Sequence, residues 1–164
     1  MPPLNVTRMF AGAPASLRPM LDLGRSILLE SELDPRLREL AILAVAHATG
    51  SEYERFQHEA LSRAMGIPDA ELEAIANGAP EDLDDEARLI VEFSEEVARD
   101  GEASEANTAA VLELLGRRQA TELVVCCAYY SMVARVIATC GVELEDVSPV
   151  DGITAGDADR FREA

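Results

Sequence analysis

The sequence contains no lysine, because all 14 of its basic residues are arginines. A chain without a lysine amine cannot form a Schiff base, which excludes aldolase and pyridoxal-phosphate chemistry of that kind. Positive charge is scarce in general: 31 Asp and Glu residues outnumber the arginines, and the formal net charge is −17. This excess of negative charge opposes contact with a phosphate backbone, so we expect no nucleic-acid partner.

Long apolar runs are also missing. The two longest, Leu40–Ala46 and Leu123–Tyr130, are far shorter than the roughly 20 residues that cross a bilayer. The N-terminus has no basic region followed by an apolar stretch, so no signal peptide is expected. Cysteine is sparse, and three cysteines with two of them adjacent do not make a disulfide framework. The sequence therefore predicts a cytoplasmic, reduced protein with no membrane partner.

Signals for β-strands are nearly absent, and helix signals dominate instead. Caps and helix-breaking residues predict helices that begin near Ala15, Asp34, Ser51, Pro68, Asp84, Ser104 and Arg118. With 164 residues, of which 48% are hydrophobic and 27% charged, the chain has the size and composition of one globular domain. We predict an all-α bundle of six to seven helices at 15–147, an N-terminal extension at 1–14 and a flexible C-terminal tail at 148–164.

Only two histidines are present, and they differ in their surroundings. His47 lies in an apolar stretch and is interpreted as a core or interface residue. His58 follows Ser51 and Glu54 at spacings that place all three side chains within about 60° of one helix face. That face has two interpretations: a candidate site with a hydroxyl, a carboxylate and an imidazole, or a solvated surface with a weak Glu–His pair.

A metal site is a further alternative, since two carboxylates and one histidine could hold a divalent cation. The di-metal sites of helical bundles place Glu and His at i, i+3, whereas Glu54 and His58 are at i, i+4. No second histidine lies on the same face. We therefore expect neither a metal nor another cofactor.

Three segments carry a resemblance to a known family: RELAIL at 38–43, GSEYERFQH at 50–58 and AMGIPDAELEAI at 64–75. They resemble the carboxymuconolactone decarboxylase family, which has an all-helical, AhpD-like fold. The last apolar helix, at 120–135, continues the similarity, which covers roughly 21–146. The resemblance implies the same fold for this chain.

One departure from the family pattern bears on the chemistry. The AhpD branch has a glutamate, a Cys-x-x-Cys pair and a histidine, and these positions fall on Glu39, on Ser51 and Glu54, and on His58. A dithiol peroxidase needs an attacking thiolate and a resolving thiol, and serine and glutamate supply neither. The resemblance therefore implies the fold and the place of the site, but argues against hydroperoxidase chemistry there.

The three cysteines lie elsewhere, at Cys126, Cys127 and Cys140. Neighbouring cysteines on a helix point about 100° apart and cannot bridge, so the first two are interpreted as small core residues. Tyr129 and Tyr130 diverge in the same way. At most one of these tyrosines is expected to reach a shared site, and a core or interface position is favoured for both.

The cysteine-free site resembles the lactone decarboxylase side of the family. In that case His58 transfers the proton, because histidine exchanges protons near neutral pH. Glu39 orients the imidazole or shares its proton, and Glu54 supports them. An anionic substrate also needs a cation, for which Arg55, Arg63 and Arg135 are candidates. The residues expected to contact the substrate are Ser51, Arg55 and Tyr129.

These observations predict a carboxymuconolactone decarboxylase-like enzyme that uses acid–base catalysis on a small, anionic, lactone-type substrate. Two alternatives stay open: a thiol peroxidase that works through the remaining cysteines, and a non-catalytic helical oligomer. The segment Leu123–Ala134 is apolar on nearly every side, which indicates a core or a subunit interface. A homotrimer or homohexamer is expected, in agreement with the assemblies usual in the family.

Overall fold

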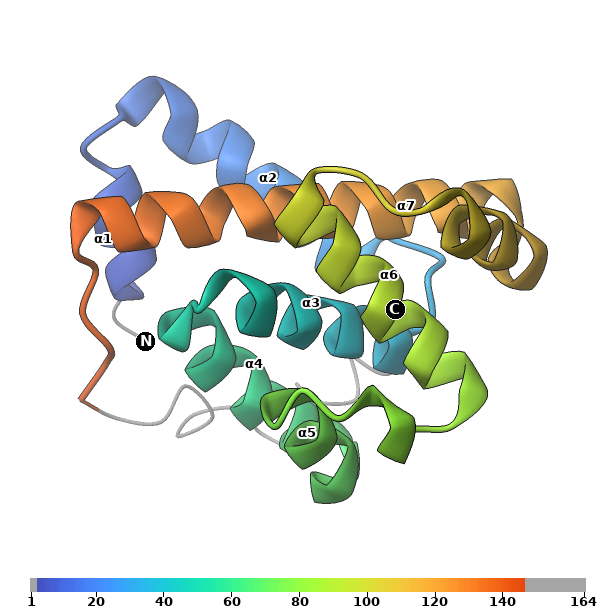
Figure 1. The fold of residues 1–164 in the computed structure, drawn as a ribbon. Helices are drawn as coiled ribbons and strands as arrows, with labels where there is room; N and C mark the ends of the chain where they lie inside the picture. Colours follow the sequence, from blue (N-terminus) through green and yellow to red (C-terminus); the bar gives the residue numbers. More distant parts are fainter. Residues whose placement is uncertain (1–2, 147–164) are drawn as a thin grey trace.

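The computed structural model describes residues 3–146 of the chain. Within this range the protein has seven α-helices, one short 3₁₀ turn and no strand, which confirms the predicted all-α class (Figure 1). The elements in chain order are α1 (Asn5–Phe10), α2 (Pro14–Leu29), α3 (Pro35–Thr49), α4 (Glu52–Met65), α5 (Asp69–Ala76), η1 (Pro80–Asp82), α6 (Asp85–Asp100) and α7 (Glu105–Cys140). The tail predicted at 148–164 lies outside the described residues.

Local signals determine where the helices begin and end. The Asp34 side chain caps α3 by accepting hydrogen bonds from two backbone amides of its first turn, and Pro35 follows at the first helical position. The helix ends at Gly50, whose φ of 67° lies in the left-handed region that favours glycine. Ser51 then caps α4 by accepting from the Glu54 amide at 3.4 Å. Helices α3 and α4 are therefore joined by a tight turn.

Helix α3 is the centre of the molecule. It packs against α4, α5, α6 and α7, and in Figure 1 it lies between α7 and the α4–α5 pair. Every residue from 37 to 46 is buried, so the helix has no exposed face over this stretch. Two charged residues, Arg38 and Glu39, fall inside this stretch and are fully buried. A buried charge is costly in free energy unless it is paired, so Arg38 and Glu39 need neighbouring groups that compensate their charges.

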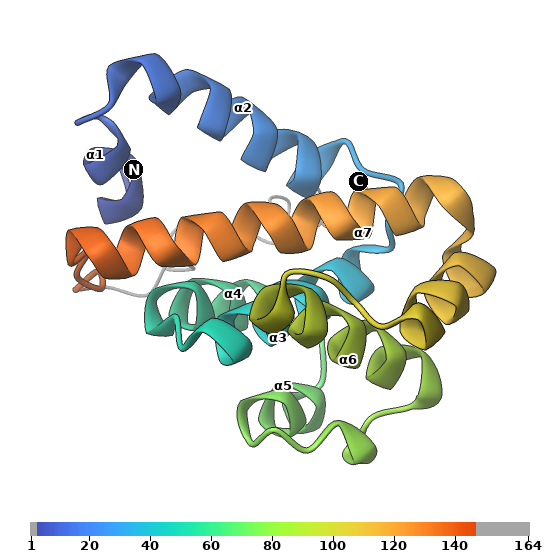
Figure 2. The same ribbon diagram turned by 45° about the horizontal axis from the view of Figure 1, so that its top comes forward.

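Helix α7 bends at Gly116, where φ is 72° and ψ is 169°. The two helices predicted at 104–115 and 118–140 therefore correspond to the two helical parts of one element. Figure 2 shows α7 between α2 on one side and α3, α4 and α6 on the other. By length and mean hydropathy α7 could cross a membrane. Core helices of water-soluble proteins share these properties, and residues such as Leu123 and Cys127 are fully buried.

The N-terminal segment folds onto the domain, which the sequence did not indicate. Residues 1–14 were expected to form an extension, yet Asn5–Phe10 form helix α1. The Phe10 side chain is buried against Tyr53 of α4 and against α7. The Asn5 amide donates to the Glu145 carboxylate at 2.8 Å, so α1 is also held by the segment that follows α7. The short helix lacks a side-chain cap, and the packing of its apolar residues Val6, Met9 and Phe10 on the domain supports it.

Candidate active site

A buried hydrogen bond joins two of the predicted site residues. His58 Nδ1 lies 2.8 Å from Glu39 Oε2, which brings α3 and α4 together. Glu39 is completely buried and His58 is 8% exposed. An ionised carboxylate can only accept, so Nδ1 donates its proton to it. In the neutral imidazole this leaves Nε2 as the nitrogen that can take up a proton.

Arg38 lies directly beside this pair. Its Nε is 3.5 Å from Glu39 Oε1, and both side chains are fully buried. A lone carboxylate in the protein interior is strongly unfavourable, whereas a neighbouring guanidinium compensates its charge. The carboxylate of Glu39 thus contacts a cation on one side and the imidazole of His58 on the other.

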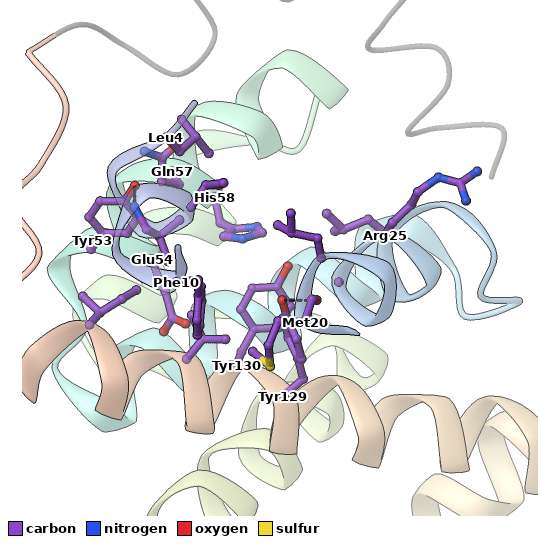
Figure 3. A pocket seen from close by; sticks show the side chains of 17 residues that line it. Leu4, Phe10, Met20, Arg25, Tyr53, Glu54, Gln57, His58, Tyr129 and Tyr130 are labelled. Atoms are coloured by element: carbon purple, nitrogen blue, oxygen red, sulfur yellow. Dashed lines mark hydrogen bonds between the residues drawn. The ribbon is translucent and has the colours of Figure 1, made fainter. Parts of the chain in front are cut away.

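A cavity of about 250 Å³ lies next to His58, between α1, α2, α4 and α7 (Figure 3). Most of its wall is apolar. The lining residues are Leu4, Val6, Thr7, Phe10, Met20, Leu21, Gly24, Arg25, Leu28, Tyr53, Glu54, Gln57, His58, Tyr129, Tyr130, Val133 and Ile137. An apolar cavity with a few polar groups at defined positions is the usual form of a small-molecule site.

Glu54 contributes a second carboxyl group to this cavity. The residue is 3% exposed, and neither carboxyl oxygen has a hydrogen-bond partner in the part of the chain that the structure describes. Burial raises the pKa of Glu54 from its ordinary value of 4.5 to about 8, and outweighs the opposite effect of the Ser51 hydroxyl. Glu54 is therefore mostly protonated at neutral pH and can donate a proton.

Two adjacent tyrosines of α7 also line the cavity. The rings of His58 and Tyr130 meet edge to face, with centroids 4.9 Å apart, and the Tyr129 and Tyr130 rings meet similarly at 5.2 Å. The expectation that at most one of the tyrosines reaches the site is therefore wrong. The cavity extends from α4 to α2, so two side chains that diverge by about 100° both border it.

The arginines predicted to bind an anion lie elsewhere. Arg55 is exposed and pairs with Glu59 at 2.9 Å, Arg63 pairs with Asp69 at 2.8 Å, and Arg135 donates to backbone carbonyls of α6 and α7. The cation that lines the cavity is Arg25 of α2, whose guanidinium points away from the other labelled side chains in Figure 3 and pairs with Glu30.

Of the predicted substrate contacts, the structure thus brings Tyr129 to the cavity but not Ser51 or Arg55. Sequence spacing placed Ser51 on the right helix face, but its hydroxyl is engaged in capping α4. Arg55 follows Glu54 by one residue, and this rotation turns it to solvent. Arg25 and Tyr130 carried no signal that spacing along one helix could detect.

The cysteines and the second histidine do not belong to the cavity wall. Cys126 and Cys127 are fully buried, and burial raises the pKa of both thiols, that of Cys127 to about 11. Their thiolates are therefore scarce at neutral pH, which fits the core interpretation. His47 is exposed at the end of α3 beside Gly78, so of its two interpretations the core position is wrong and the interface position stays a prediction. Among residues 3–146 no group of three or more His, Cys, Asp or Glu side chains could hold a metal ion.

Comparison with known families gives one match. Residues 14–96 match the model of the Carboxymuconolactone decarboxylase family. The match covers half of the chain and includes Glu39, Glu54 and His58, but it ends before α7. No curated protein matches the chain.

Proposed function

The chain belongs to the carboxymuconolactone decarboxylase family, and from this premise we propose that it is an acid–base enzyme that decarboxylates a small lactone-type substrate. One observation carries the proposal: the buried 2.8 Å hydrogen bond between Glu39 and His58 at the wall of the apolar cavity. A carboxylate that fixes an imidazole in one tautomer and orientation is a recurring arrangement for proton transfer.

The Glu39–His58 pair performs the proton transfer. Glu39 accepts from Nδ1 and stabilises the imidazolium, while Nε2 exchanges a proton with the substrate. In the lactone, the bond between the ring carbon and its carboxylate breaks and CO₂ leaves. The electron pair moves into the conjugated ring and onto the lactone carbonyl oxygen, which gives a dienolate. His58 then delivers its proton to a ring carbon, which restores the carbonyl and gives the decarboxylated lactone, and the imidazole regains a proton from solvent.

Glu54 keeps the cavity accessible to an anion. The charges of Arg38 and Glu39 compensate each other, and Glu54 carries no charge when it is protonated. An anionic substrate therefore meets no fixed negative charge at neutral pH, although the whole protein is acidic. A substrate carboxylate held against apolar walls is poorly solvated, and loss of CO₂ disperses its charge over the ring. Above pH 8 the ionised Glu54 opposes binding of the substrate.

The test is an incubation of the purified protein with γ-carboxymuconolactone, with released CO₂ and product mass as readouts. Wild type and His47→Gln, a matched variant of the exposed histidine, should turn over the lactone. His58→Gln should be at least about 100-fold slower, because general acid–base catalysis contributes roughly 10²–10⁴. Absence of turnover by wild type would reject the decarboxylase assignment, and equal rates of the two variants would reject the role of His58.

We also propose that the enzyme is a cytoplasmic homotrimer or homohexamer. Three apolar residues of α7, Val124, Val125 and Met132, are between 40% and 44% exposed in the single chain. Exposed apolar side chains on one helix favour contact with another surface. Light scattering during gel filtration measures the assembly directly, and a monomeric mass at micromolar concentration would contradict this part of the proposal.

A further inference from the structure

The cavity has one polar end, where Tyr130 of α7 faces His58 of α4. Tyr130 is 6% exposed, and its ring meets the imidazole edge to face at a centroid distance of 4.9 Å. Apolar side chains of α1 and α2, such as Phe10 and Leu28, form other parts of the wall. A molecule in the cavity therefore meets the imidazole of His58 and the hydroxyl of Tyr130 side by side.

The hydroxyls of the two neighbouring tyrosines differ in their partners. The Tyr129 hydroxyl donates to the Met20 carbonyl at 3.1 Å, which ties α7 to α2. In Figure 3 a dashed line marks this bond, whereas none leaves Tyr130. Throughout the described residues, the Tyr130 hydroxyl makes no such bond. Burial keeps the pKa of Tyr130 well above its ordinary value, so its proton is retained. A hydroxyl that lines a cavity and donates to no protein group is free to donate to an acceptor of a ligand.

We propose that the Tyr130 hydroxyl binds the carbonyl oxygen of the substrate beside His58, and that the site accepts small carbonyl compounds with an apolar body, including neutral ketones that can enolise. This inference rests on the proposed function, because it assigns His58 the proton transfer. It adds a second catalytic residue and a broader substrate class.

The chemistry that follows is proton transfer at the carbon next to the carbonyl. His58 Nε2 removes a proton from that carbon, and the C–H electron pair forms a C=C bond. The carbonyl π electrons move to the oxygen, which becomes an enolate oxygen held by the Tyr130 O–H. Return of the proton from His58 restores the ketone, so no oxidant or further reactant is consumed. A hydrogen bond to the oxygen is stronger in the enolate than in the ketone, so Tyr130 lowers the barrier.

The walls and the volume of the cavity define the substrate class. Its volume of about 250 Å³ is slightly below the usual range of ligand sites, roughly 300–1,000 Å³. A body of one or two fused rings is therefore appropriate. The cation at the rim, Arg25, is directed away from the polar end and is paired with Glu30. Binding by apolar walls and one hydroxyl does not require a negative charge on the ligand.

The experiment uses 2-tetralone, a two-ring ketone, and tetralin, the same body without the oxygen. Equilibrium dialysis of the full chain measures the affinity for both compounds. Wild type should prefer 2-tetralone by about tenfold, the usual effect of one buried hydrogen bond. Tyr130→Phe should bind the two compounds equally, while His47→Gln, at an exposed residue outside the cavity wall, should keep the preference. Equal affinity of wild type for both compounds, or a preference that survives in Tyr130→Phe, overturns the proposal.

A spectroscopic measurement on wild type decides the matter even if a variant does not fold. The infrared carbonyl stretch of bound 2-tetralone should lie at lower frequency than in an apolar solvent, and an unshifted band overturns the proposal. Exchange of the α-protons in D₂O, followed by NMR, should slow by about 10²–10³ in Tyr130→Phe. The His58→Gln variant should retain the infrared shift but lose the exchange. Failure to decarboxylate the lactone therefore rejects the proposed function without removing the carbonyl-binding signal.

Discussion

Gly24 of α2 packs directly against the hydroxyl of Tyr129 on α7. A Cβ at position 24 would lie 2.6 Å from this oxygen and 3.2 Å from the ring carbon that bears it. The same hydroxyl donates to the Met20 carbonyl one turn earlier in α2. The absence of a side chain at Gly24 thus lets α2 approach α7 and close one side of the cavity.

Because of this contact, Gly24→Ala should destabilise the protein, and Tyr129→Phe should reduce that destabilisation. The added methyl group displaces Tyr129 and breaks its hydrogen bond, which should lower the free energy of unfolding by about 1–3 kcal/mol. In a Tyr129→Phe background the clashing oxygen is absent, and Gly24→Ala should cost less than half as much. Urea unfolding of the four proteins of this double-mutant cycle measures the coupling. Additive effects would show that the two residues do not constrain each other.

Glu39→Gln should separate catalysis from binding. The amide removes the charge that stabilises the imidazolium, and kcat should fall by about 10²–10⁴, with a smaller change in KM. It also removes the carboxylate 3.5 Å from Arg38, so unfolding free energy should drop by about 3–5 kcal/mol. Steady-state kinetics and urea unfolding measure both effects. Glu52→Gln, an exposed position of α4, serves as the control and should match wild type; a similar kcat in both variants would contradict the role of Glu39.

Glu54 should make the protein less stable as pH rises. Its pKa is raised to about 8 in the folded protein from an ordinary 4.5, so the folded state binds more protons between these two values. The contribution of Glu54 to the free energy of unfolding then falls by about 1.4 kcal/mol for each pH unit in this window, and is constant on either side of it. Glu54→Gln should abolish this dependence, so its stability relative to wild type should increase from pH 5 to pH 8. Parallel unfolding curves at pH 5, 6.5 and 8 test this, and a constant difference would refute the raised pKa.

Glu145 should hold α1, which forms part of the cavity wall, in place. Its carboxylate accepts from the Asn5 amide at 2.8 Å and from the Tyr53 hydroxyl at 2.5 Å, and so fastens α1 to α4. In Glu145→Ala these bonds are lost, and amide hydrogens of α1 should exchange at least tenfold faster in hydrogen–deuterium exchange. Glu143 makes its contact with Asn5 through its backbone carbonyl, so Glu143→Ala is a matched control that should leave α1 protected. Equal exchange in the two variants would show that α1 is held by its apolar contacts alone.

Several parts of the structure could be predicted from short stretches of sequence. The beginning of α3 at Asp34-Pro35, its end at Gly50 and the Ser51 cap of α4 are interactions between residues a few positions apart. The alignment of Glu54 and His58 on one face depends only on helical geometry. Pairing of Glu39 with His58 was implied by the family resemblance, since spacing along one helix gives no information about a neighbouring helix.

Other predictions failed because they depend on contacts between distant segments. Helix α1 has too few residues to be stable alone, and Phe10 and Asn5 hold it against α4 and the end of α7. At most one of the adjacent residues Tyr129 and Tyr130 was expected to reach the site, but the cavity is wide enough for both side chains to line it. Arg25 lines the cavity because its neighbour Gly24 lets α2 pack closely against Tyr129 of α7.

The sequence by itself therefore determined the helical segments from α2 to α7 and the helix face that carries Glu54 and His58, because these follow from interactions within a few residues. Tertiary structure alone decided the chemistry of that face. Burial between α4 and α7 raises the pKa of Glu54, and α3 supplies the carboxylate for His58. Desolvation and the choice of partner depend on what packs around a side chain, and residues far away in the sequence provide those neighbours.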